Sequence, residues 1–478
     1  MRTIAAAWTK QKSFCAYIIN RLVLRFFNVK TRFLLFLAFL TTCIVSCSDD
    51  EKFTVSPTVT LSFSTDSVKM DTVFSTVGSR TYDFWVYNRG NRGLHLQSVR
   101  LRQGNQTGFR VNVDGSYLDN DLGAVVTDLE VRSGDSLRVF VEFTAPRNQQ
   151  LTPQMVEDEL QFFLESGIQQ RVVLRAYAWD ALLCDSIIVS RDSIIESSQP
   201  IVIRQGLRVD SAATLTVRNT TLFFHDKAGA DIYGTLLTDS VIMRGDRLDH
   251  MFDYLPYDRV SGQWRGLRFY STSFHNELIA TEIRNAESGI VCDSTAFPSD
   301  RQRLYMERSV VHNCAGPGLL AFNSWVGLLR CQFTNTQGDC VAFYGGAAIM
   351  DHCTVAQFYP FVGGRGAALR FANFYGDNAY PLHAMTMTNS IVTGYDDDVV
   401  MGQTLEGDSI TPFTYSFDNT LLRTPALEDT INCKNMMWET PKDSIQGKQH
   451  FRLIDEENLI YDFHLDSLST AHGKGCYD

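Results

Sequence analysis

Apolar and polar residues alternate in short runs along most of the chain, and one such run is repeated three times near its middle. The repeated frame reads Glu307-Arg308-Ser309-Val310-Val311, Leu329-Arg330-Cys331-Gln332-Phe333 and Asp351-His352-Cys353-Thr354-Val355, so its third residue recurs every 22 positions. Alternation is typical of half-buried strands, and a period of this size indicates stacked structural repeats. Because one turn cannot bury its apolar face alone, we expect a parallel β-solenoid in which each turn pairs with the next.

The same frame returns outside this stretch. Its third position falls on Thr220, Ser240, Ser390 and Thr420, and Thr281 is a weaker match. Small polar or thiol side chains at one position of every turn are expected to stack into a ladder inside the solenoid. Intervals longer than one turn predict inserted loops, above all between Cys353 and Ser390 and over 246–262.

A different pattern precedes the repeats. Turn-forming residues separate short alternating runs, which predict strands at Thr58–Phe63, Tyr82–Tyr87, Leu94–Leu101, Phe109–Val113, Val125–Val131, Ser136–Phe143, Glu159–Leu164 and Arg171–Tyr177. Such a number of strands over residues 54–180 predicts a two-sheet sandwich. Phe84-Trp85-Val86-Tyr87-Asn88-Arg89-Gly90 and Ser133-Gly134-Asp135-Ser136 are similar to immunoglobulin-like modules of the major-sperm-protein and PapD type. That resemblance implies a spacer, with binding through a sheet edge as the alternative.

Residues 181–478 resemble the right-handed parallel β-helix (pectate-lyase-like) superfamily, in the form found on Bacteroidetes surface proteins. The resemblance rests on Ile201-Val202-Ile203, Ala213-Thr214-Leu215-Thr216-Val217, Ile232-Tyr233-Gly234-Thr235 and Gly262-Gln263-Trp264-Arg265-Gly266-Leu267. In the same resemblance, Phe463-His464-Leu465-Asp466-Ser467-Leu468-Ser469 looks like the closing turn of the solenoid. It implies an all-β fold and says almost nothing about activity.

The N-terminus predicts export and lipid anchoring. Lys30-Thr31-Arg32 precedes a short apolar run, and Ile44-Val45-Ser46-Cys47 resembles the lipobox in which the cysteine, here Cys47, becomes the lipidated first residue. We therefore expect residues 1–46 to be a signal region and residues 47–53 a lipidated tether. Within the signal region, we expect 1–28 to be an artefact of a start codon placed too early. The acidic stretch Ser48-Asp49-Asp50-Glu51 resembles the surface-export signal of Bacteroidetes lipoproteins, so we expect an outer-membrane protein facing the exterior.

The charge of the chain excludes one class of partner. The formal net charge is −11, and the N-terminal 46 residues are basic without a single acidic residue, so the remainder is more acidic still. Nucleic-acid binding needs clustered Lys and Arg, and we expect none. No Gly-rich phosphate loop or metal-ligand spacing occurs, which predicts no cofactor and no metal.

The candidate catalytic groups also have structural interpretations. The eight cysteines after Cys47 are expected to be mostly free buried thiols, and Trp264 a core or capping aromatic. His312 and His352 are expected to stack at the edge of a turn, and Asp396–Asp398 to form a solvated bend. The hydrolase signatures of the superfamily are absent, so no catalytic residue is assigned.

The best ligand candidates are aromatic. The interval between Cys353 and Ser390 contains the residues we predict to bind a ligand, Phe358, Tyr359, Phe361, Phe374, Tyr375, Tyr380 and Asp377. Aromatic rings with a few polar groups stack well on sugars, although the same rings could simply pack the loop down. The sequence thus favours a non-enzymatic surface protein that binds glycan or another partner. A polysaccharide lyase or glycoside hydrolase and a structural envelope component are the alternatives.

One dispersed pattern points to modification. Asp followed by Ser or Thr and then a small or aliphatic residue resembles the O-glycosylation site of Bacteroides exported proteins, and turn chemistry is the alternative explanation. The pattern occurs at Asp66, Asp71, Asp135, Asp185, Asp192, Asp210, Asp239, Asp293, Asp408, Asp429, Asp443 and Asp466. Ser240, which lies in the repeat frame, is expected to be too buried for modification.

Overall fold

The computed structural model describes residues 52–118, 121, 123–297 and 300–475. Over these residues the chain is all-β, and its helical segments are two short 3₁₀ turns, η1 (Tyr257–Arg259) and η2 (Gly447–His450). None of the described helices is long and apolar enough to cross a membrane. The predicted signal region and lipidated Cys47 lie outside the described residues.

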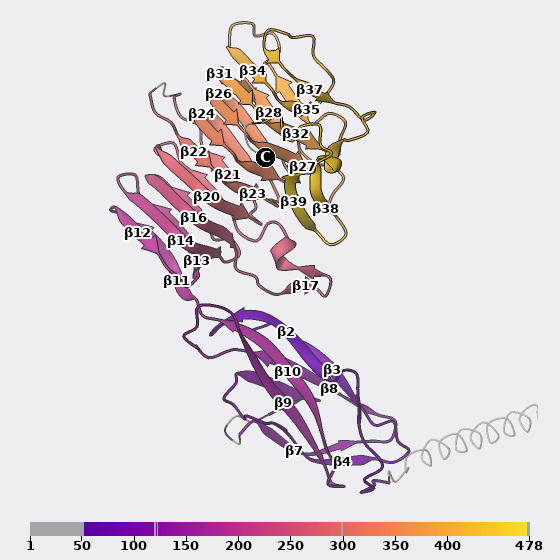
Figure 1. The fold of residues 1–478 in the computed structure, drawn as a ribbon. Coiled ribbons are helices and arrows are strands. Elements are labelled where there is room, and N and C mark those ends of the chain that lie inside the picture. Colours follow the sequence, from indigo (N-terminus) through magenta and orange to yellow (C-terminus); the bar gives the residue numbers. More distant parts are fainter. Residues whose placement is uncertain (1–51, 119–120, 122, 298–299, 476–478) are drawn as a thin grey trace, which may run out of the picture.

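The N-terminal part is a sandwich of two five-stranded sheets, shown in indigo to purple in Figure 1. One sheet has the order β1-β3-β8-β5-β6 and contains Ser62–Phe63, Tyr82–Tyr87, Ser136–Phe143, Phe109–Val113 and Ser116–Tyr117. The other has the order β2-β10-β9-β4-β7 and contains Ser67–Phe74, Gln169–Trp179, Gln154–Leu164, Leu94–Leu101 and Val125–Val131. The alternation predicted the strands well, except that it missed β2 and the short β6.

The second part is a parallel β-helix whose strands form one continuous 23-stranded sheet. Its turns have three faces, and several long strands bend from one face into the next. Face one contains the ends of β11 (Leu182–Val189) and β13 (Ile201–Val209), β15 (Ala230–Ile232), β19 (Leu267–Phe269), β21 (Ile290–Cys292), the starts of β24 (Leu319–Leu329) and β26 (Val341–Asp351), β28 (Leu369–Ala372) and β33 (Val400–Gln403).

Face two contains β12 (Ser193–Glu196), the starts of β14 (Thr214–Phe224), β16 (Thr235–Gly245) and β20 (Asn276–Arg284), β22 (Leu304–Glu307), the ends of β24 and β26, β31 (Leu382–Thr388), β34 (Phe413–Asp418) and β36 (Cys433–Lys434). Face three contains the starts of β11 and β13, the ends of β14, β16 and β20, β23 (Val310–His312), β25 (Gln332–Thr334), β27 (Thr354–Gln357), β32 (Ile391–Gly394), β35 (Leu421–Arg423) and β37 (Met437–Glu439).

The repeat frame marks the bend between faces two and three. Its second residue has a positive φ in each of the three central turns, 48° at Arg308, 54° at Arg330 and 52° at His352. The next side chain points inward and donates to the carbonyl two residues back, as Ser309 does to Glu307 at 2.9 Å and Ser390 to Thr388 at 2.6 Å. The cysteine thiols make the same contact at longer distances. The ladder therefore accepts Ser, Thr or Cys because each can bond the carbonyl that the bend frees.

The frame was misplaced by one residue in an early turn. Strand register pairs Thr220 with Val241, so Ser240 is the positive-φ residue of the bend (φ 59°) and Val241 occupies the ladder position. Ser240 is exposed rather than buried. A polar Asp-Ser pair suits an exposed left-handed bend, because its side chains can bond locally there.

Two further predictions about this domain were wrong. His312 lies on face three in register with Thr334, whereas His352 belongs to the column of bend residues, so the two histidines do not stack. Residues 463–469 do not close the solenoid with another turn. Instead, β39 (Ile460–Leu465) pairs antiparallel with β38 (Phe451–Asp455), and Figure 1 shows this yellow hairpin lying against the solenoid beside β23 and β27.

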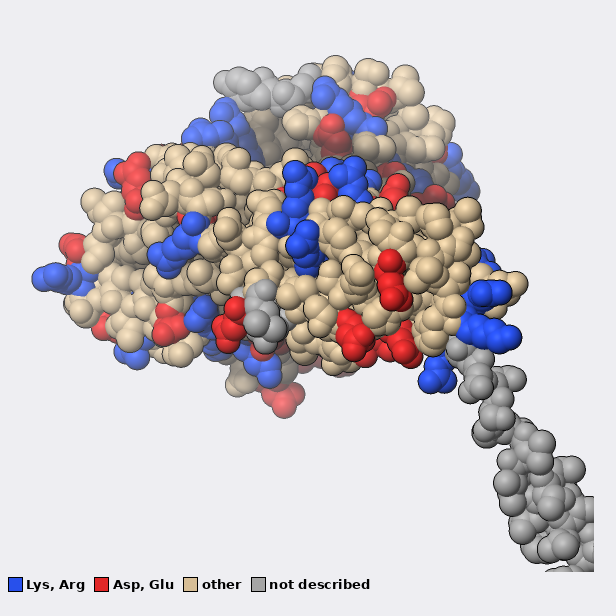
Figure 2. Space-filling view, turned by 90° about the horizontal axis from the view of Figure 1, so that it is seen from below, with Lys and Arg blue, Asp and Glu red and all other residues tan. Residues whose placement is uncertain are grey.

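The sandwich and the solenoid are in direct contact. Phe74 and Trp179 of the sandwich pack against Phe223 of the solenoid, with ring centroids 5.0 and 6.0 Å from that of Phe223. His250, in the loop inserted after β16, is hydrogen-bonded through its ring to Asp71 of β2 at 2.6 Å. Acidic and basic side chains are interspersed on the face drawn in Figure 2.

Candidate functional site

The outward side chains of face three change character along the solenoid. Strand register aligns Arg244, Arg284, His312 and Thr334 in one row, which is polar in the early turns. In later turns the outward Ala356, Ile391 and Leu421 are nearly fully buried although they point away from the solenoid interior, and so are the polar Thr393 and Arg423. Such residues need a cover outside the solenoid.

The C-terminal hairpin supplies that cover. Phe451 and Phe463 pack with Phe358, and their ring centroids lie 6.1 and 6.4 Å from that of Phe358. These rings and the outward apolar residues of face three form a hydrophobic cluster separate from the solenoid core. Burying a Phe or Leu side chain contributes about 2 kcal/mol, so the apolar half of face three holds the hairpin in place.

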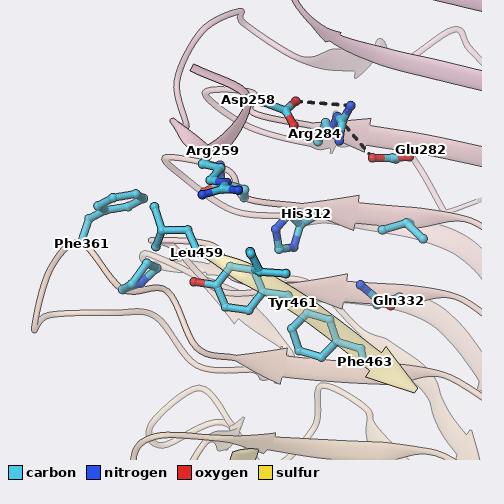
Figure 3. A pocket seen from close by; sticks show the side chains of 14 residues that line it. Asp258, Arg259, Glu282, Arg284, His312, Gln332, Phe361, Leu459, Tyr461 and Phe463 are labelled. Atoms are coloured by element: carbon cyan, nitrogen blue, oxygen red, sulfur yellow. Dashed lines mark ion pairs between the residues drawn. The ribbon is translucent and has the colours of Figure 1, made fainter. Parts of the chain in front are cut away.

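A cleft of about 380 Å³ remains where the hairpin meets the polar half of face three. Its walls come from the loop inserted after β16, the segment that follows β27, the hairpin and face three itself. Figure 3 shows Asp258, Arg284 and Glu282 along one side and the rings of Tyr461 and Phe463 on the other, with His312 between them.

Arginine side chains neutralise both carboxylates of the cleft. Arg284 lies 3.3 Å from a carboxylate oxygen of Asp258 and 3.3 Å from one of Glu282. The buried Arg244 lies 2.5 Å from Asp258. Burial, offset in part by Asp258, lowers the pKa of Arg244 to about 10, so it remains charged near neutral pH. The charges are therefore fixed in place before any ligand arrives.

Two polar side chains in the cleft could form hydrogen bonds to a ligand. The hydroxyl of Tyr461 is buried, and no hydrogen-bond partner for it occurs among the described residues. Burial raises the pKa of Tyr461, so the phenol stays protonated and remains a donor. Figure 3 shows this hydroxyl directed toward the side of the cleft that carries Arg259 and Phe361. A buried polar atom without a partner calls for an explanation, and a bound ligand or water is the usual one.

His312 is the second group, and it is neutral at physiological pH. Burial, reinforced by the charge of Arg284, lowers its pKa to about 4. One ring nitrogen is hydrogen-bonded to Thr334 at 2.8 Å, and the ring meets Tyr461 edge-on at 5.5 Å between centroids. The imidazole is therefore a fixed neutral polar group and a weak base.

Direct contacts hold the walls of the cleft together. Ser261 of the inserted loop and Tyr359 share a hydroxyl–hydroxyl hydrogen bond of 2.8 Å, and Arg259 donates to the carbonyl of Asn458 at the hairpin turn. Trp264 is buried as predicted, stacks on Phe224 and donates to the carbonyl of Arg284 at 2.9 Å. The strand that carries Arg284 is thus fixed from inside the solenoid.

The predicted aromatic ligand residues divide between two places. Phe358 is buried against the hairpin, Tyr359 is buried beside the inserted loop, and of these three Phe361 alone lines the cleft. Phe374, Tyr375, Asp377 and Tyr380 lie in or beside a small hairpin of β29 (Phe374–Tyr375) and β30 (Asn378–Ala379). There the exposed Tyr375 ring packs edge-on against Phe322 and Tyr344.

Sequence reasoning missed most of the cleft. Arg284, His312 and Tyr461 come from three segments that are distant in sequence. The available signal was the outward position three residues after the ladder residue, which reads Arg284, His312 and Thr334 in successive turns. Tyr461 carried no such signal because the hairpin lies outside the repeat.

A second constellation resembles a hydrolase triad but is structural. Ser469 is hydrogen-bonded to a ring nitrogen of His450 at 2.8 Å, and the other ring nitrogen lies 3.2 Å from Glu439. All three residues are buried. Glu439 also bonds Arg423 and accepts from Thr393 and the Gly447 amide. A nucleophile needs an accessible hydroxyl, so this network instead fixes the end of the solenoid.

The described residues contain no reactive thiol site or metal cluster. Seven cysteines are free, and all but Cys184 are buried, as the sequence predicts for most of them. Burial raises the pKa of Cys292, Cys314 and Cys340 to about 12, which keeps these thiols protonated. Groups of three or more His, Cys, Asp or Glu suited to a metal ion are absent from the same residues.

Comparison with known proteins finds distant structural likenesses to both parts of the chain. No family model and no curated protein matches the sequence. Among solved structures, the A-module of the Azotobacter vinelandii mannuronan C-5 epimerase AlgE6 is 10% identical, with 55% of this chain and 84% of that chain covered and a TM-score of 0.29. The catalytic domain of a GH87 α-1,3-glucanase is 10% identical, with coverages of 77% and 89% and a TM-score of 0.27. A PapD-like domain of human CEP192 is 13% identical, with coverages of 28% and 96% and a TM-score of 0.18.

Likenesses this distant do not bear on activity. The β-helix itself is defined by the strand pairing of this chain, in which the solenoid strands stack in parallel register from β11 to β37.

Proposed function

We propose that the protein binds a carbohydrate in the cleft between the C-terminal hairpin and the polar half of face three. The observation that carries the proposal is the Tyr461 hydroxyl, a buried donor that lacks a partner among the described residues and lies beside charged groups and aromatic rings. Sugar binding uses this combination, since rings stack on the apolar side of a sugar while fixed polar groups bond its hydroxyls.

The test compares single-atom changes in the full purified chain. A glycan array first identifies a neutral oligosaccharide that binds, and calorimetry then measures its affinity for the protein and for Tyr461→Phe. Loss of one hydrogen bond should weaken binding about threefold to tenfold. The matched control is Tyr177→Phe, which removes an exposed hydroxyl on the sandwich. Equal affinity of Tyr461→Phe and the parent would refute the role of the cleft.

A glycoside hydrolase or lyase is the second candidate, because Asp258 and Glu282 both face the cleft. Paired carboxylates carry out glycoside hydrolysis, but here arginines bind both of them. Incubation of any bound glycan with the protein, followed by chromatography, separates the two functions. Shorter products that disappear in Asp258→Asn would establish catalysis, and an unchanged glycan would support binding alone.

We also propose that Cys47 carries a lipid that anchors the protein to the outer membrane, with the sandwich as a spacer. The lipobox-like sequence before Cys47 and the acidic residues after it support this proposal. Labelled fatty acid should enter the parent protein in cells and not Cys47→Ala. Protease added to intact cells should degrade a surface-exposed protein and spare one that faces inward.

A further inference from the structure

A second hollow of the solenoid is a groove beside β39. It has a volume of about 580 Å³ and shares Val310, Gln332 and Phe463 with the cleft. Its floor follows the bend between faces two and three, and the C-terminal residues after β39 form its opposite wall. We call this hollow the ladder groove.

The floor of the ladder groove is a column of bend residues. Strand register stacks Arg308, Arg330, His352, Asn389 and Asn419 one above another, one per turn. Adjacent strands are about 4.8 Å apart, so the column presents a polar group at each such step. All five have positive φ, and this conformation repeats their outward direction from turn to turn.

The lining of the ladder groove is basic. Arg308, Arg330 and Lys474 contribute basic side chains, His352 and His464 add imidazoles, and no Asp or Glu occurs among its described lining residues. The whole chain has more acidic than basic residues and a formal net charge of −11. The lining of the ladder groove therefore has the opposite charge from the chain as a whole.

Carboxylates outside the lining compensate some of this charge. Glu307 pairs with Arg308, Asp351 with His352 at 2.9 Å, and Asp462 with His464 at 2.5 Å. These acids lie beside the groove rather than among its lining residues. They hold the basic side chains in place and leave the groove itself with donors, because guanidinium and ammonium groups have several N–H bonds each.

We propose that the ladder groove binds the acidic groups, carboxylate or sulfate, of an extended anionic glycan. Cationic side chains on neighbouring turns suit a polymer that carries repeated anionic oxygens, and the groove adjoins the cleft at Val310, Gln332 and Phe463. The inference depends on the proposed function only in that the polymer is a glycan. The charge requirement stands on the groove alone.

The test uses three soluble polymers and the full chain. Dextran sulfate supplies sulfate groups, polygalacturonate supplies carboxylates, and dextran is neutral. At low salt, one or both acidic polymers should bind, and affinity should fall as salt rises because partly exposed charges are screened beyond about 10 Å at 0.1 M. Which of the two binds identifies the acidic group. Failure of both acidic polymers to bind would overturn the proposal.

Matched variants locate the binding. Arg308→Asn with Arg330→Asn removes two charges while keeping a residue that tolerates positive φ, as the next turns already do with Asn389 and Asn419. Acidic polymers should bind roughly fivefold to tenfold more weakly. The control removes the same charge from the sandwich, at exposed Arg92 and Arg110. Equal losses in both variants would mean attraction to net charge and would overturn the site.

The outcomes also separate the two proposals. If a neutral oligosaccharide binds, Tyr461→Phe weakens that binding and no acidic polymer binds, the ladder-groove proposal is overturned and the cleft proposal stands. If acidic polymers bind through the ladder groove and neutral sugars do not bind, the ladder-groove proposal stands and the cleft proposal is overturned.

Discussion

The buried network at the end of the solenoid makes the sharpest stability prediction. Glu439 and Arg423 are 3% and 5% exposed, and His450 is fully buried. Replacing Glu439 by Gln keeps the side-chain shape but removes the charge that compensates Arg423. Breaking a buried ion pair from one side costs about 3–5 kcal/mol. Asp397, at 3.3 Å, still partners Arg423, so we expect a loss near the lower end of that range.

Thermal unfolding measures this loss. A change of 1 kcal/mol shifts the melting temperature of a domain of 150–250 residues by about 2–4 °C. The solenoid is larger, so about 3 kcal/mol corresponds to roughly 6 °C. Fluorescence of Trp438, the residue before Glu439, reports unfolding of this end. Glu277→Gln, an exposed change on β20, should stay within about 0.5 kcal/mol of the parent.

Acid should abolish the difference between parent and variant. Burial alone would raise the pKa of Glu439, but hydrogen bonds from His450, Arg423 and the Gly447 amide outweigh it and hold the pKa below 4.5. A carboxyl whose pKa is lowered on folding stabilises the fold above its unfolded pKa, and this stabilisation is lost as pH falls through the folded value. The two melting temperatures should therefore converge below about pH 4. A neutral-pH loss below about 1 kcal/mol would refute the reasoning.

Three more changes test the ladder, the cleft histidine and the hairpin. Cys353→Ser should cost under about 1 kcal/mol in chemical denaturation because neighbouring turns use Ser at the same position, whereas Cys353→Leu should overpack the ladder by about 1–3 kcal/mol. His312 is neutral in the folded protein, with a pKa of about 4, but takes up a proton when the chain unfolds, so stability should fall as the pH drops from 6.5 to 4. His312→Asn should make this fall shallower. An unchanged slope of melting temperature against pH would contradict the assigned pKa. Phe463→Ala should cost about 3–5 kcal/mol and speed amide hydrogen exchange in the hairpin. If Phe463→Ala speeds amide hydrogen exchange in the sandwich as much as in the hairpin, the hairpin is not a locally packed cover.

The repeat was predictable because one local rule recurs in most turns. A residue able to adopt positive φ precedes a small donor that bonds the carbonyl two residues back, as at Arg308-Ser309 and Asn389-Ser390. The rule involves only consecutive residues, so it can be recognised in the sequence without knowledge of the fold. Its one failure, at Asp239-Ser240, arose because serine fits both positions of the rule and only strand pairing distinguishes them.

The cleft was not predictable in the same way. Phe358 and Phe361 are three residues apart and equally aromatic, yet one is buried and the other lines the cleft. The difference comes from the C-terminal hairpin, whose docking face is set by residues about a hundred positions later. Alternation within 460–465 predicts a strand, but it does not say that the strand leaves the solenoid and lies on its outside.

The position of the cleft follows from the cost of covering charge. The hairpin buries Ile391 and Leu421, which lose nothing by leaving water, and it ends beside the row that carries His312 and Arg284. Extending it over Arg284 would strip water from a charge that two carboxylates only partly surround, at a cost of several kcal/mol. The apolar cover and the polar row therefore meet at an edge that stays open. At that edge the cover contributes the Tyr461 and Phe463 rings and the solenoid contributes fixed charges, and a sugar requires both.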